Sequence, residues 1–171
     1  PDIAAMVFCF LASGQLLAQT NLGHLAINVT DDSGGPIACR IHLKDPNEKS
    51  VRAEKLPFFR DHFVCSGKVQ LDLAPGNYSY EIERGPEYLM RTGSVTVTAA
   101  NTQNLALKLE RLADMSAEGW WSGDLHVHRP VEDIELLMQA EDLHVAPVMT
   151  WWNTKNEWAK RKPPADLVFR F

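Results

Sequence analysis

Apolar and polar residues alternate in a series of short runs between Leu25 and Leu112, and this period of two constrains the fold more than any other feature of the sequence. In the run IACRIHLK, every second side chain from Ile37 onwards is apolar, and most of those between are polar. Successive side chains of a strand point to opposite faces, so such alternation indicates strands with one buried and one solvated face. The pattern returns in LAINVT, KVQLDL, YSYEIE, SVTVTA and LALKL.

Turn-forming residues separate these runs. The segments DDSGGP, KDPNEK, APGN and RGPE supply the Gly, Pro, Asn and Asp that tight reversals need. Short strands at this spacing are typical of an antiparallel β-sandwich of about seven strands. We therefore expect a sandwich domain over residues 24–113.

The pattern changes after Asp114, and all five tryptophans fall between Trp120 and Trp158. The segment GWWSGDLHVH predicts a strand, RPVEDIELLMQAEDL a helix, and HVAPVMTWW a second strand that is apolar enough to be buried on both faces. Strand, helix and strand in this order predict the start of an α/β domain over residues 118–171. A full α/β barrel takes roughly 250 residues, so the expected fold class is multi-domain, with the second domain truncated.

Two histidines lie one residue apart in the first of these strands. His126 and His128 are expected to project to the same side, because residues i and i+2 of a strand do so. Two imidazoles at this spacing supply two of the ligands that a zinc-type site requires. Asp124 is placed to support an imidazole from behind, and Arg129, if it turns inward, to bind a substrate oxyanion. The alternatives are a strand with two satisfied histidines, and a solvent-exposed arginine that starts the helix.

The stretch SGDLHVHRP resembles the first motif of the PHP superfamily, especially its exported CehA/McbA-like metallohydrolases. The resemblance implies a distorted (β/α)7 barrel that binds divalent zinc, manganese or iron and hydrolyses phosphoesters or related esters and amides. It implies that His126 and His128 are metal ligands and that Asp124 is the acid of the motif. The sequence departs from the family at MTWWN, where Trp151 and Trp152 stand in place of an Asp-His pair.

The sandwich region carries a second resemblance. The stretches VTDDSGGPIACRIHL and LDLAPGNYSYEIERG resemble the carboxypeptidase-regulatory or transthyretin-like sandwich of exported bacterial proteins. A sandwich of this kind is usually an accessory module, so this resemblance implies a fold rather than an activity.

Two functions follow from these patterns. The first is an exported metal-dependent hydrolase acting on a small molecule or a glycan, with this fragment inactive by itself. The second is a non-catalytic envelope or carbohydrate-binding protein, in which the tryptophans of a degenerate barrel stack on a sugar ring. Packing of Trp151 and Trp152 in the core or at the rim of the barrel is the alternative to sugar binding. The intact His-x-His pair favours the first function, and the missing Asp-His pair favours the second.

The first residues predict export. The apolar run IAAMVFCFLASGQLLAQ is shorter than the roughly 20 residues of a membrane span and resembles a truncated signal peptide over residues 1–19. A buried N-terminal helix is the alternative. Contact with a membrane is expected only through this signal, and the oligomeric state cannot be read from the sequence.

The remaining features of the sequence are less specific. The net charge of −5 and the lack of a dominant basic cluster argue against a nucleic-acid partner. In an oxidising compartment, Cys39 and Cys65 either pair or remain free buried thiols. The other histidines, at positions 24, 42, 62 and 144, have no convergent partner in the sequence and are expected to be structural or solvated.

Overall fold

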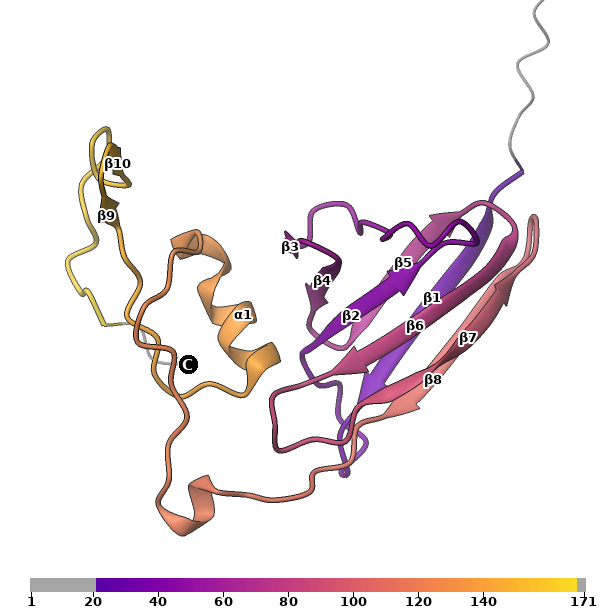
Figure 1. Cartoon of the computed structure of the whole chain (residues 1–171), viewed down its shortest axis with the longest axis horizontal. Coiled ribbons are helices and arrows are strands. Elements are labelled where there is room, and N and C mark those ends of the chain that lie inside the picture. The colour runs from indigo at the N-terminus through magenta and orange to yellow at the C-terminus, as the bar shows by residue number, and fades with distance from the viewer. Residues whose placement is uncertain (1–20, 169–171) are drawn as a thin grey trace, which may run out of the picture.

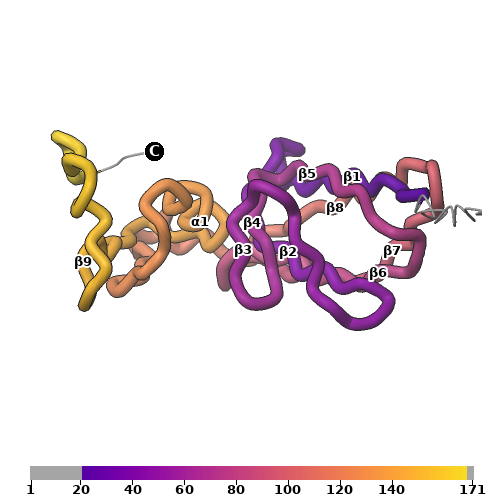
Figure 2. The backbone as a smooth tube through the Cα atoms, turned by 90° about the horizontal axis from the view of Figure 1, so that it is seen from above, coloured from indigo at the N-terminus to yellow at the C-terminus, as the bar shows by residue number. Residues whose placement is uncertain are grey.

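The computed structural model describes residues 21–168, so the predicted signal peptide at 1–19 lies outside the described residues. Two sheets face each other, one with the strand order β5-β1-β8 and the other with the order β3-β4-β2-β6-β7 (Figures 1 and 2). The expected β-sandwich is therefore confirmed at the level of fold class. Its strands are β1 (Gly23–Thr30), β2 (Cys39–Lys44), β3 (Phe58–Phe59), β4 (His62–Cys65), β5 (Lys68–Leu73), β6 (Gly76–Glu83), β7 (Arg91–Val97) and β8 (Thr102–Lys108).

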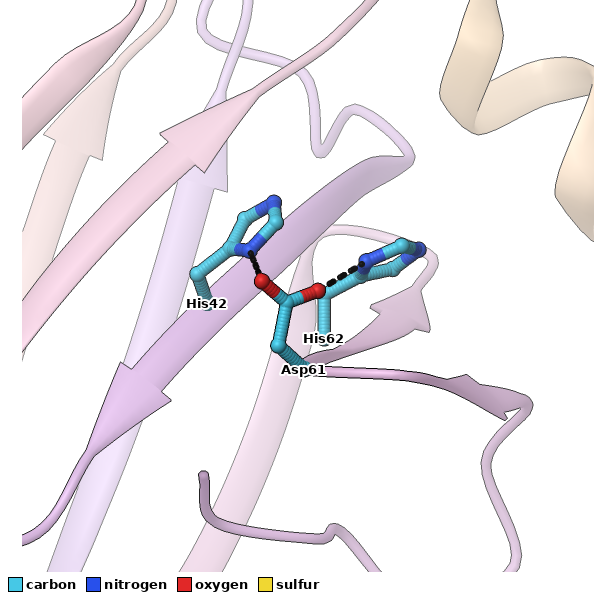
Figure 3. A group of neighbouring side chains, drawn as sticks. All are labelled: His42, Asp61 and His62. Carbon is cyan, nitrogen blue, oxygen red and sulfur yellow. Dashed lines mark hydrogen bonds and ion pairs between the residues drawn. The ribbon is translucent and has the colours of Figure 1, made fainter. Parts of the chain in front are cut away.

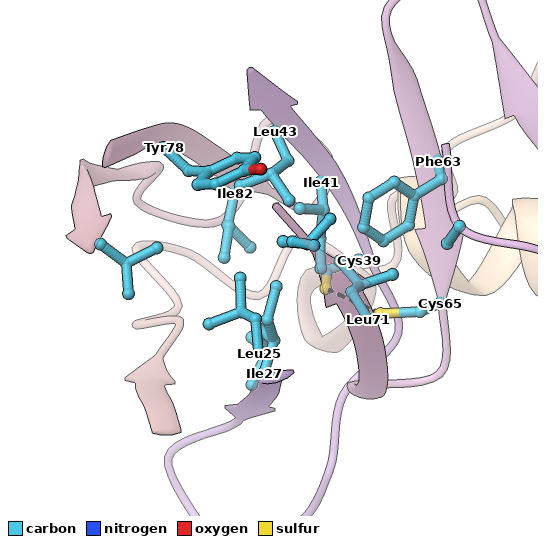
Figure 4. Packing of buried hydrophobic residues seen from close by; sticks show 14 of the residues in the cluster. Leu25, Ile27, Cys39, Ile41, Leu43, Phe63, Cys65, Leu71, Tyr78 and Ile82 are labelled. Atoms are coloured by element: carbon cyan, nitrogen blue, oxygen red, sulfur yellow. Dashed lines mark hydrogen bonds between the residues drawn. The ribbon is translucent and has the colours of Figure 1, made fainter. Parts of the chain in front are cut away.

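The alternating apolar residues form the core between the two sheets. From β1 of one sheet, Leu25 and Ile27 point inward toward Ile41 and Leu43 of β2 and Ile82 of β6 in the other sheet (Figure 4). All five side chains are almost fully buried. The hydrophobic effect on this apolar surface is what holds the two sheets together.

Strand β4 is one of two features that the alternation did not predict. Phe63, Val64 and Cys65 are buried one after another, because the strand is covered on both faces. Phe63 and Cys65 belong to the sandwich core, whereas Val64 packs against Ala140 on the other side. A strand buried on both faces has no polar face, and its sequence therefore does not alternate.

The second unexpected feature is the parallel pairing of β1 with β8, which run side by side from His24 opposite Thr102 to Thr30 opposite Lys108. The other strand pairs of the sandwich are antiparallel, as expected. The connection after β7 crosses from the five-stranded sheet to the three-stranded one, and this brings β8 next to β1 in the same direction.

Residues 114–168 form a smaller, mostly irregular unit. It contains the single-turn helices η1 (Ser116–Glu118) and η2 (Val131–Asp133), the helix α1 (Ile134–Glu141) and a hairpin of β9 (Trp151–Trp152) and β10 (Lys155–Asn156). The segments before and after α1 run parallel, as expected for strand–helix–strand, but they meet only in isolated bridges at Gly123–Val145 and Val127–Val148. Within residues 118–168 there is no barrel, so the predicted PHP-like barrel is wrong for the described residues.

Helix α1 is seated on the outer face of the sandwich at β2 and β4. Ala140 is buried in a small apolar cluster with Ala38 and Val64, and Leu136 and Leu137 pack around it. This apolar contact explains why α1 lies directly beside β2 and β4 in Figure 1. None of the helices in the described residues is both long and apolar enough to cross a membrane.

Ion pairs surround this apolar contact. The Asp142 carboxylate accepts hydrogen bonds from Arg84 Nη2 at 2.7 Å and from Arg111 Nη2 at 2.8 Å. Arg40 Nη1 lies 2.9 Å from Glu141 Oε1. Removing one partner of such a pair is most destabilising where water is largely excluded, because the other charge is then left buried, and the Asp142 side chain is only 10% exposed.

Cys39 and Cys65 lie directly opposite each other on β2 and β4 as free thiols, with their Sγ atoms 3.9 Å apart. The hydrogen bond with Cys65 and burial both raise the pKa of the Cys39 thiol. Of the two alternatives that the sequence left open, the structure therefore contains the free buried thiols.

Candidate functional site

His126 and His128 project to the same side of their segment, which is the geometry that the sequence predicts. Their Nε2 atoms lie 2.9 Å apart, and their ring centroids lie 4.8 Å apart. Val127, which lies between the two histidines, is buried, whereas Leu125, which precedes His126, is 75% exposed. The local backbone thus brings two imidazole nitrogens to one point at the surface.

Asp124 and Arg129 each contact a neighbouring group, and their suggested roles stay predictions. The Asp124 Oδ1 atom accepts a hydrogen bond from the backbone N–H of His126 at 3.0 Å, rather than from an imidazole. The Arg129 guanidinium stacks over the Phe59 ring, 4.7 Å from its centroid. Arg129 therefore contacts the β3 strand of the sandwich.

The described residues bring two candidate metal ligands together at His126 and His128. A catalytic zinc-type site takes three protein ligands and leaves one position for water. Across residues 21–168, neither group of converging His, Cys, Asp and Glu side chains includes His126 or His128. The pair supplies two ligands, and metal binding at His126 and His128 stays a prediction.

Trp152 packs against both histidines. Its ring lies edge-on to His128 with centroids 5.0 Å apart and to His126 with centroids 5.8 Å apart. Trp152 and His128 line a cavity of about 520 Å³. The β9–β10 hairpin contributes Asn153, Thr154 and Lys155 to the same cavity. The neighbouring Trp151 is 71% exposed.

A second cluster lies on the wet face of the five-stranded sheet, beside a cavity of about 640 Å³ between α1 and the β3–β4 hairpin. Here Asp61 lies between two imidazoles, with Oδ2 3.4 Å from His42 Nδ1 and Oδ1 3.2 Å from His62 Nδ1 (Figure 3). On its other side, His42 Nε2 lies 3.1 Å from Glu83 Oε1.

The charges around this cluster are paired. Arg40 Nη2 lies 2.9 Å from Glu83 Oε1, and the other end of the same guanidinium binds Glu141 of α1. Burial lowers the pKa of His62, and the hydrogen bond with His62 lowers the pKa of Asp61. Burial raises the pKa of Glu141, with Arg40 opposing this shift. The neutral imidazole and ionised carboxylate are the forms that bind cations.

Sequence reasoning assigned His42 and His62 structural or solvated roles and missed this convergence. The two residues are 20 positions apart, and only the antiparallel register of β2 and β4, with Ile41 opposite Phe63, brings them side by side. The weak signal in the sequence was the pair Asp61-His62. The other two histidines make polar contacts of an ordinary kind, His24 with Asp72 at 2.6 Å and His144 with Ser122 at 2.9 Å.

No family model and no curated protein matches the chain. Among solved structures, it is similar to the minor pilin GBS52 of Streptococcus agalactiae (18% identity, TM-score 0.44, 55% of this chain and 46% of that chain). It is also similar to the Bacillus anthracis TIE protein (19% identity, TM-score 0.41, 66% and 19%) and to a pilus-presented adhesin, Cpa (18% identity, TM-score 0.30, 54% and 27%). The chain thus spans less than half the length of each of these proteins.

The resemblance to PHP metallohydrolases, and with it the predicted hydrolase function, is wrong. No family model matches the chain, and two of the three solved structures named above are a minor pilin and a pilus-presented adhesin. Residues 118–168 form a short helix and isolated bridges instead of a barrel. The narrower resemblance to transthyretin-like sandwiches is likewise matched by no family model. What holds is the coarser expectation of a β-sandwich.

Proposed function

We propose that the chain is a non-catalytic protein of the cell surface that binds glycans, and that the Trp152 cavity holds one sugar ring. The observation that carries this proposal is the composition of the cavity. Trp152 lines the cavity together with polar residues that include Asn153, Thr154 and Lys155, and charged residues Arg129 and Glu157 lie along it as well.

This combination suits a pyranose ring. The apolar C–H face of a sugar packs on an aromatic ring, while its hydroxyls exchange hydrogen bonds with neighbouring polar groups. Trp152 is 49% exposed, so a ligand can reach its ring. Its contacts with His126 and His128 hold the indole in place, which reduces the side-chain entropy lost on binding.

Binding without chemistry agrees with the rest of the site. The imidazole pair has no third converging ligand in the part of the chain that the structure describes, and Arg129, which stacks on Phe59, also lines the Trp152 cavity. Export remains part of this proposal and is supported by the apolar run in residues 1–19.

Trp152→Ala should weaken glycan binding at least tenfold, because it removes the stacking surface. Aromatic stacking contributes about 0.5–1.5 kcal/mol beyond the area buried, and about 1.4 kcal/mol is a tenfold change in affinity. The measurement is a glycan array screen with the full chain, followed by calorimetric titration of the strongest ligand into each variant. Trp152→Phe keeps an aromatic ring and should retain most of the affinity.

Trp120→Ala is the matched control. Trp120 is also an exposed tryptophan, but it precedes the His-x-His segment and lies outside the cavity lining. Its removal should leave the affinity unchanged. Equal losses in both variants, or an array without any bound glycan, would overturn the proposal.

A further inference from the structure

We propose that His42, Asp61 and His62 form a binding site for one first-row transition-metal dication, separate from the His126–His128 pair and independent of glycan binding. Each residue offers one ligand atom, and these atoms all lie within 4.8 Å of one another. Two imidazoles and one carboxylate are the donor set on which zinc, cobalt, nickel and iron sites are built.

The backbone fixes the two imidazoles. His42 lies on β2 and His62 on β4, and the two strands are paired in the core of the five-stranded sheet. Their ring centroids are 4.8 Å apart, and both side chains are less than one-fifth exposed. Asp61 is more exposed and approaches both rings from the turn before β4, as Figure 3 shows, so a cation can enter past it.

His42 lies between two carboxylates, one near each ring nitrogen. If its Nε2–H donates to Glu83, a neutral imidazole presents the lone pair of Nδ1 to Asp61 Oδ2 at 3.4 Å. Two acceptors then face each other. A cation held between them turns this repulsion into two bonds, and a second proton on the ring is the competing solution.

Glu83 takes the role that carboxylates commonly have behind metal-binding histidines. Such a carboxylate accepts the N–H of the nitrogen that does not bind the metal, and so fixes the tautomer and the orientation of the ring. Glu83 is itself held by Arg40 at 2.9 Å, and Arg40 is held by Glu141 of α1. The positive charge of Arg40 is thus paired with two carboxylates.

The experiment begins from the double variant His126→Ala/His128→Ala, which removes the other candidate ligands. After dialysis against zinc and then against metal-free buffer, elemental analysis should find about one zinc per chain. Adding His42→Ala/His62→Ala to this background should remove that zinc. Asp61→Asn, which keeps the size of the side chain but removes its charge, should weaken zinc binding at least tenfold in a competition titration.

His24→Ala is the matched control, because His24 is also bonded to a carboxylate, Asp72, but has no second imidazole beside it. It should leave the zinc content unchanged. Cobalt gives an independent readout, since its visible absorption should appear in the background variant and disappear with the loss of His42 and His62. Circular dichroism of each variant separates loss of the site from loss of the fold, and the milder Asp61→Asn keeps the test valid if the alanine variants unfold.

Two results would overturn the proposal. One is a zinc content in the His126→Ala/His128→Ala background that is near zero. The other is a zinc content that persists unchanged in folded protein without His42 and His62. In either case the cluster is a proton-sharing network, and the second proton rather than a metal lies between His42 and Asp61.

Discussion

Phe63→Ala should lower the free energy of unfolding by about 3–5 kcal/mol, the cost that is typical of removing a buried aromatic ring and leaving a cavity. Phe63 is the largest of the fully buried side chains and packs in the core between the sheets, as Figure 4 shows. Because a domain of this size is stable by about 5–15 kcal/mol, we expect a much lower urea midpoint, measured by far-UV circular dichroism, which reports the strands of the sandwich.

Phe59→Ala is the control for this substitution. It removes the same side chain from the neighbouring strand β3, where the ring is 44% exposed and contacts Arg60 and Arg129. Its cost should stay near 1 kcal/mol or less, the range usual for surface positions. If the two variants were equally stable, the placement of Phe63 in the core would be wrong.

Asp142→Ala should release α1 from the sandwich while leaving the sandwich folded. The carboxylate is held by both Arg84 and Arg111, and its removal leaves two guanidinium groups partly buried without their partner. Removing one member of a fully buried ion pair costs about 3–5 kcal/mol, and we expect about 2–3 kcal/mol here because Arg111 is partly exposed. Hydrogen exchange should accelerate in residues 134–141 and change little in β1 and β2.

Asp114→Ala provides the comparison. Asp114 also pairs with Arg111, at 3.2 Å, but its side chain is half-exposed. Exposed pairs contribute about 0–1 kcal/mol, so this variant should exchange like the parent chain. Fast exchange throughout the sandwich of Asp142→Ala would contradict the view that the ion pairs join two separable units.

Most of the sandwich could be predicted from the sequence because the alternation of apolar and polar residues along each strand shows which of its faces is buried. In β2 and β5, the alternation predicts one solvent-exposed and one buried face, and the structure has strands at Cys39–Lys44 and Lys68–Leu73. Two features escaped for physical reasons. Strand β4 is buried on both faces because α1 covers Val64. The parallel pairing of β1 with β8 depends on a connection that crosses between the sheets, and no local pattern in the sequence indicates this connection.

The candidate sites show a similar division. The shared direction of His126 and His128 follows from two positions in one segment, so the sequence could predict it. The convergence of His42 with His62 depends on the pairing of two strands, and the metallohydrolase resemblance depended on ligands that one short motif does not contain. A local pattern therefore predicted local geometry correctly, and the inference of a whole enzyme from it was wrong.

The parallel pairing of β1 with β8 has a mechanical consequence. The chain enters β1 at the end of the sandwich remote from α1 and leaves β8 at the end near it (Figure 1). Tension along the chain therefore pulls these two neighbouring strands in opposite directions, and the ladder from His24–Thr102 to Thr30–Lys108 is loaded in shear, all of its bonds at once. We expect the sandwich to resist stretching in a force microscope better than a domain whose end strands peel apart bond by bond.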